Sequence, residues 1–133
     1  MPSIRSRFGR ALRLAVVGGG PGAWIGEMHR GAAELDGNWK VVAGVFSSDA
    51  QRSRNAGAAF GLDPVRSYGD VAELLARERA RDDGADALAI MTPNDTHYPY
   101  AAAALDVGLD VIGDKPVTHD FSQACDLLRK VHT

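Results

Sequence analysis

The chain has 133 residues, of which 45% are hydrophobic and 24% charged, and its formal net charge is -2 at pH 7. This length suits one soluble domain with a hydrophobic core, the charge gives no reason to expect nucleic acid or an anionic membrane as a partner, and no apolar run approaches the roughly eighteen residues that span a bilayer. The one cysteine, Cys125, cannot form an internal disulfide, so we expect a cytoplasmic protein in which Cys125 is buried filler in a helix.

Residues 1–11 contain three arginines and no acidic residue, and we expect them to form a frayed basic tail ahead of a domain over residues 12–133. Five apolar runs in that domain predict buried strands. They cover Leu12–Val17, Val41–Phe46, Val65–Tyr68, Ala85–Met91 and Val111–Gly113.

Apolar residues at helical spacing follow each run and predict five helices. Three of these helices begin with the spacing of a capping box, in which a short polar side chain is followed three residues later by Glu or Gln. The pairs are Ser48 with Gln51, Asp70 with Glu73, and Asp120 with Gln123. The mixed charges between residues 77 and 83 predict a solvated helix end.

This alternation of strands and helices predicts an α/β fold with a doubly wound parallel sheet of the Rossmann type. Ligands of such sheets bind at the carboxyl ends of the strands. The unusual turns of this sequence follow the expected strands, and no group of His, Cys, Asp or Glu has the spacing of a metal site.

A glycine-rich loop follows the first expected strand and opens the first expected helix. Gly18, Gly20 and Ala23 match the G-x-G-x-x-A form of the dinucleotide fingerprint; alternatively, Gly26 is its third glycine. Such a loop lets the backbone approach a pyrophosphate at the positive end of the helix. We therefore predict a coenzyme contact along the whole loop, which is formed by Gly18, Gly20, Pro21, Gly22, Ala23, Trp24 and Ile25. The indole of Trp24 either packs under the coenzyme or holds the loop against the sheet.

The end of the second strand predicts which coenzyme is bound. A carboxylate there bonds the adenosine ribose of NAD and repels the additional phosphate of NADP. Ser47 and Ser48 occupy this place with Arg52 nearby, which favours NADP over NAD, although Asp49 is close enough to turn inward.

Two further turns complete the predicted site. Thr92, Pro93 and Asn94 follow the fourth expected strand, and His97 either faces the cleft or stands in the first turn of the next helix. Asp114, Lys115 and Pro116 follow the fifth. A lysine beside a carboxylate and held by a proline can bond a reacting hydroxyl and favour loss of its proton, so Lys115 is the candidate catalytic residue.

Four segments together resemble the N-terminal domain of the Gfo/Idh/MocA oxidoreductases, a family that includes glucose–fructose oxidoreductase and inositol dehydrogenase. The segments are Leu14–Gly20, Ile25–Arg30, Thr92–His97 and Asp114–Val117. The family usually has Glu where this chain has Asp114, and its glycine loop is commonly shorter.

The resemblance implies hydride transfer between NAD(P) and a sugar, cyclitol or related polyol. It implies that Gly18, Gly20 and Ile25 line the pyrophosphate. Thr92, Pro93, Asn94 and His97 would line the nicotinamide, and Lys115 would touch the nicotinamide ribose and the substrate hydroxyl.

The resemblance also implies a C-terminal α/β domain that supplies most substrate contacts and the interface of a homo-oligomer, and we expect this sequence to lack that domain. We therefore expect this chain to bind coenzyme and to be inactive alone. A non-catalytic dinucleotide sensor or docking module is the alternative; it would not need Lys115. A third hypothesis, a Rossmann domain that binds a nucleotide-sugar, is disfavoured by the two turns.

Overall fold

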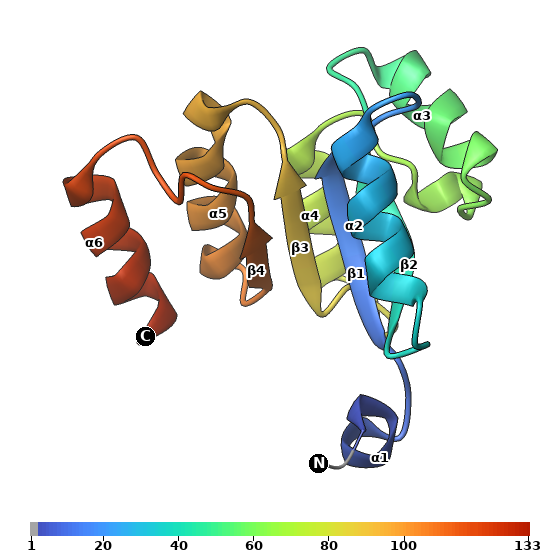
Figure 1. The fold of residues 1–133 in the computed structure, drawn as a ribbon, viewed down its shortest axis with the longest axis horizontal. Coiled ribbons are helices and arrows are strands. Elements are labelled where there is room, and N and C mark those ends of the chain that lie inside the picture. Colours follow the sequence, from blue (N-terminus) through green and yellow to red (C-terminus); the bar gives the residue numbers. More distant parts are fainter. Residues whose placement is uncertain (1–2) are drawn as a thin grey trace.

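The computed structural model describes residues 3–133, in which a helical segment separates each strand from the next (Figure 1). The strands are β1 (Leu12–Gly18), β2 (Trp39–Val45), β3 (Ala87–Met91) and β4 (Asp110–Gly113). The α-helices are α1 (Ile4–Phe8), α2 (Trp24–Glu34), α3 (Ala50–Ala59), α4 (Val71–Arg79), α5 (His97–Asp106) and α6 (Phe121–Val131). Two short 3-10 helices are η1 (Pro64–Arg66) and η2 (Asn94–Thr96). No helix of the described residues is both long and apolar enough to cross a membrane.

The four strands form one parallel sheet in the order β2-β1-β3-β4. Side chains of β1 alternate between its two faces, because successive residues of a strand point in opposite directions. Val17 packs in a cluster with residues of α4 and α5, whereas Val16 packs in a second cluster near α2 and α3. The sheet is therefore covered on both faces, as predicted for a doubly wound α/β fold.

The predicted strand Val65–Tyr68 is wrong. Pro64 opens the 3-10 helix η1 there, and only one parallel bridge, between Ser67 and Gly44, continues the sheet. An acidic residue of α4 holds the side chain of Arg66 inside the protein. Local apolar patterning does not reveal this contact.

Two predictions about helix starts and the N-terminal tail also need correction. Asp49, not Ser48, caps α3, because its carboxylate accepts a hydrogen bond from the Arg52 N–H at 2.8 Å. The tail is not frayed over its described part: residues 4–8 form α1, and the Arg5 guanidinium donates to the Gly37 carbonyl. Residues 1–2 of the predicted tail lie outside the described residues.

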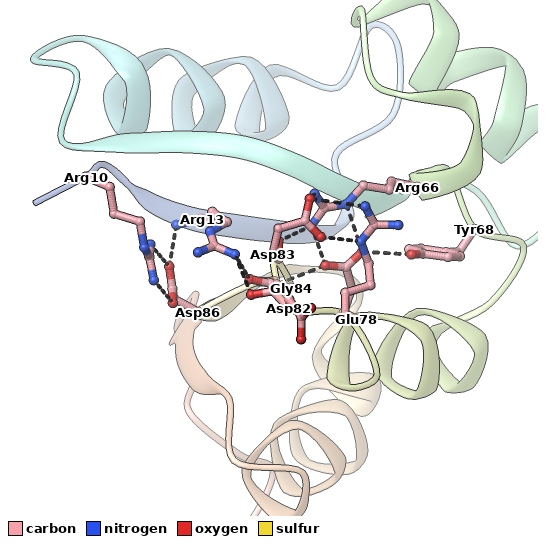
Figure 2. Close-up of polar contacts among 11 residues, drawn as sticks. Arg10, Arg13, Arg66, Tyr68, Glu78, Asp82, Asp83, Gly84 and Asp86 are labelled. Atoms are coloured by element: carbon pink, nitrogen blue, oxygen red, sulfur yellow. Dashed lines mark hydrogen bonds and ion pairs between the residues drawn. The ribbon is translucent and has the colours of Figure 1, made fainter. Parts of the chain in front are cut away.

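The charged run 77–83 is not simply solvated, because Glu78 is 2% exposed (Figure 2). Its carboxylate accepts hydrogen bonds from the Arg66 guanidinium, the Tyr68 hydroxyl at 2.7 Å and the Ala85 N–H at 2.9 Å. The pKa of Tyr68 is raised above its usual range, mainly by burial and secondly by its hydrogen bond to Glu78. The loop that leads into β3 is thus fixed by a buried ion pair.

Helix α6 packs beside α5 at the β4 end of the molecule (Figure 1). Phe121, Leu128 and Val131 are exposed on α6, and a cavity of about 730 Å³ lies between α5, β4 and α6. Cys125, expected to be buried, is only partly buried in α6.

Candidate functional site

The four turns singled out in the sequence lie at one edge of the sheet. The strands are parallel, so the residues that follow β1, β2, β3 and β4 all emerge at the carboxyl edge. In Figure 1 this edge is at the top, where the turn after β1 enters α2 and the turn after β3 leads to α5.

Close backbone approaches hold the glycine loop in place. A Cβ on Gly18 would collide with the Met91 carbonyl. Gly18 also has a backbone φ of 84°, which residues with a side chain rarely adopt. A Cβ on Gly20 would lie 2.6 Å from the Phe46 carbonyl oxygen. These glycines let the loop lie directly on the ends of neighbouring strands.

The outer side of the loop is open. Gly22 has a φ of 78° and no heavy atom within 4 Å of the place of a Cβ. Trp24 is 70% exposed, so the indole does not hold the loop against the sheet. The first turn of α2 receives no hydrogen bond from a capping side chain, whereas Asp side chains cap α3, α4 and α6. Open N–H groups at a helix start, with room before them, fit the pyrophosphate of a dinucleotide.

The residues after β2 emerge at the same edge of the sheet as the glycine loop. Ser47 is partly buried, and Ser48 and Arg52 are exposed. The Asp49 carboxylate is engaged at the start of α3, and the Ser47 hydroxyl accepts from the Asp49 N–H at 3.1 Å.

His97 connects two of the turns. It stands at the start of α5 and is 4% exposed; its Nδ1 lies 2.7 Å from the Pro116 carbonyl and its Nε2 lies 3.0 Å from the Thr92 carbonyl. Each ring nitrogen therefore faces a backbone carbonyl oxygen, and the ring N–H donates to one of them. The imidazole supports the turns, whereas Pro93 and Asn94 stay exposed beside it.

The turn after β4 presents Lys115 outward. Lys115 and Pro116 are exposed and are joined by a cis peptide bond. Asp114 is partly buried, and its Oδ1 accepts from His29 Nε2 at 2.9 Å. This contact joins the turn to α2, the helix that opens at the glycine loop.

Sequence reasoning gave no role to two residues of α2. His29 contacts Asp114, and the adjacent Arg30 donates to the Gly19 carbonyl at 2.6 Å. The Arg30 guanidinium also stacks 3.8 Å from the centre of the Phe60 ring, and burial lowers its pKa. The 85-residue separation of His29 and Asp114 leaves no local signal of their contact.

A parallel sheet covered on both faces, with a glycine loop entering a helix at its carboxyl edge, defines a dinucleotide-binding domain of the Rossmann type. The model of the oxidoreductase family with an NAD-binding Rossmann fold matches residues 12–133. The chain therefore belongs to the Gfo/Idh/MocA oxidoreductase family, as its sequence motifs suggested.

Individual relatives agree with this assignment. YfiI, an uncharacterized oxidoreductase of Bacillus subtilis (strain 168), is 39% identical over 109 residues, which are 81% of this chain and 28% of YfiI. The crystal structure of an oxidoreductase from Pseudomonas syringae is 40% identical, with a TM-score of 0.91 over 92% of this chain and 34% of that one. An inositol dehydrogenase homolog from Azotobacter vinelandii, solved with NADH and myo-inositol, is 37% identical, with a TM-score of 0.92 over 98% of this chain and 35% of that one. The chain thus spans about a third of the length of these relatives.

Proposed function

We propose that this chain binds a nicotinamide dinucleotide along the carboxyl edge of its sheet, as part of an oxidoreductase that acts on a sugar, cyclitol or related polyol. One observation carries the proposal: the open glycine loop and the Lys115 turn are held to the same helix, α2, through Arg30 and the 2.9 Å contact of His29 with Asp114. The solved homolog with NADH and myo-inositol supports the substrate class.

Each turn would hold a different part of the coenzyme. The glycine loop would hold the pyrophosphate, the residues after β2 the adenosine ribose, and the turns after β3 and β4 the nicotinamide side. The proposed contacts are Gly18, Gly20, Pro21, Gly22, Ala23, Trp24 and Ile25; Ser47, Ser48 and Arg52; and Thr92, Pro93, Asn94, Asp114, Lys115 and Pro116, with His97 behind them.

Lys115 is the proposed catalytic residue. A bound nicotinamide supplies or accepts the hydride. Lys115 is exposed at the edge of the sheet, where its Nζ would bond the substrate hydroxyl and favour movement of the hydroxyl proton. The partly buried side chain of Asp114, the residue before this lysine, is fixed by His29.

The residues after β2 support NADP as the preferred coenzyme. Asp49 uses one carboxylate oxygen to cap α3, and Ser47, Ser48 and Arg52 offer hydroxyls and a guanidinium suited to a phosphate. The Azotobacter vinelandii homolog was solved with NADH. A direct comparison of the two coenzymes therefore tests this part of the proposal.

Substrate turnover needs more than the coenzyme edge. Holding a substrate against the nicotinamide supplies about 7–11 kcal/mol of a reaction barrier. Since this chain spans about a third of its relatives, we expect it to bind coenzyme and to turn over little by itself.

A titration of the chain with NADH and NADPH, followed by tryptophan fluorescence, tests the proposal. Trp24 begins α2 at the glycine loop and reports on the carboxyl edge, whereas Trp39 begins β2 at the opposite, amino end of the sheet. Saturable binding with NADPH tighter is the expected result, and tighter NADH would remove the NADP preference. Binding of neither coenzyme to a chain that far-UV circular dichroism shows to be folded would overturn the proposed function.

A further inference from the structure

Two consecutive residues of α2 reach in different directions, because neighbouring helical residues are turned by about 100°. His29 Nε2 reaches Asp114 after β4, on one side of β1. The Arg30 guanidinium reaches the Gly19 carbonyl after β1 and stacks on Phe60, which ends α3 on the other side. One turn of α2 thus contacts both the glycine loop and the Lys115 turn.

The contact between His29 and Asp114 has a defined polarity. A carboxylate oxygen accepts hydrogen bonds, so Nε2 is the donor at 2.9 Å. Both side chains are partly shielded from water, with 22% of His29 and 31% of Asp114 exposed. Asp114 is joined directly to Lys115, so the position of His29 constrains the turn that presents the lysine.

The contact of Arg30 is equally constrained. Its guanidinium lies 3.8 Å from the centre of the Phe60 ring, and the same group donates to Gly19 at 2.6 Å. Gly19 also lies against α2, since a Cβ there would be 2.7 Å from the Gly26 Cα. The loop is therefore seated on the helix at two points.

We propose that His29 and Arg30 are positioning residues that set the nicotinamide-side turn and the pyrophosphate loop at a fixed spacing. His29 acts through Asp114 on the turn that holds Lys115, and Arg30 acts through the Gly19 carbonyl on the loop. This inference rests on the proposed function, because the spacing matters only to a ligand that spans both turns.

The proposal predicts different effects of these residues on the binding of two ligands, NADH and ADP. NADH reaches both turns, whereas ADP carries only the adenosine and the two phosphates, so it reaches the loop and the residues after β2 but not the Lys115 turn. Loss of the His29 contact therefore weakens NADH and spares ADP. Loss of the Arg30 contact weakens both to a similar extent.

The experiment measures the dissociation constants of NADH and ADP for the folded chain by isothermal titration calorimetry. We expect His29→Leu to weaken NADH about tenfold, the loss typical of one hydrogen bond to a charged group, and to change ADP less than about twofold. His29→Gln, whose amide nitrogen can take the place of Nε2, restores most of the NADH affinity. His29→Asn, with a shorter side chain, does not restore it and serves if His29→Leu fails to fold.

Two further variants complete the test. Arg30→Met is expected to weaken NADH and ADP equally. In an Asp114→Asn background the His29→Leu change costs less than it does in the wild type, because the two residues act through one contact. Equal losses of NADH and ADP in His29→Leu, or no loss of either, would overturn the inference. If the folded wild type binds neither NADH nor ADP, the proposed function itself fails.

Discussion

Replacing Arg66 by Met is expected to destabilise the fold strongly. Arg66 is 6% exposed and Glu78 2%, and the guanidinium makes two of the four hydrogen bonds that the Glu78 carboxylate accepts. Methionine fills the stem of the arginine but leaves the buried carboxylate with only the Tyr68 hydroxyl and the Ala85 N–H. Breaking a buried ion pair on one side costs about 3–5 kcal/mol. The free energy of unfolding of a whole domain is only about 5–15 kcal/mol.

Urea unfolding followed by far-UV circular dichroism measures this loss. With a slope of about 2 kcal/mol per molar urea, the midpoint should fall by about 2 M. Arg79→Met is the matched control: it makes the same change one residue from Glu78, at an exposed position of α4, and should shift the free energy of unfolding by less than about 0.5 kcal/mol. The double variant Arg66→Met with Glu78→Met should recover part of the loss, because no charge then stays buried. A loss below about 1 kcal/mol in Arg66→Met, the size of an exposed pair, would refute the reasoning.

Three further outcomes are expected. Gly20→Ala forces the loop away from the Phe46 carbonyl, 2.6 Å from the new Cβ, and should weaken NADH at least about tenfold in a fluorescence titration. Gly31→Ala in the open interior of α2 should instead raise the free energy of unfolding by about 0.5–1 kcal/mol and leave NADH binding unchanged. Hydrogen bonds from Arg10 hold the pKa of Asp86 below its ordinary 3.8, so this stabilisation is complete above that value and is lost as the pH falls through the lower folded pKa. The difference in urea midpoint between wild type and Asp86→Asn should therefore shrink as the pH is lowered from 7 to 3.

The two central strands were the clearest in the sequence, because burial on both faces leaves a continuous apolar run. Leu14 to Val17 and Ala87 to Met91 are buried throughout, so their pattern is unambiguous. In the run Val65–Tyr68, Val65 is exposed and Arg66 and Ser67 are polar, and the buried position of Arg66 depends on Glu78, twelve residues away. A contact with another element of the fold therefore determines the structure of this segment, and local periodicity does not predict that contact.

The sequence likewise predicted some features of the candidate site and missed others. The four turns could be placed at one edge because parallel strands fix where their carboxyl ends lie. The capping residue of α3 was misplaced by one position, since Ser48 and Asp49 are both good caps and the backbone chooses between them. The contact between His29 and Asp114 depends on how α2 lies across the sheet, which only the packed structure specifies.

The two ends of the sheet therefore differ in what their polar groups do. At the amino ends, Arg10 pairs with Asp86 and Arg66 pairs with Glu78 (Figure 2). The charged groups there are thus partnered within the protein, and they fix the segments that lead into β1 and β3. At the carboxyl ends, the first turn of α2 lacks a side-chain cap, and Lys115 faces outward. Substitutions at the amino ends should thus change the free energy of unfolding and leave the NADH-to-ADP affinity ratio intact. Substitution of His29 should change that ratio, because His29 contacts the turn that holds Lys115 and is distant from the proposed adenosine contacts after β2.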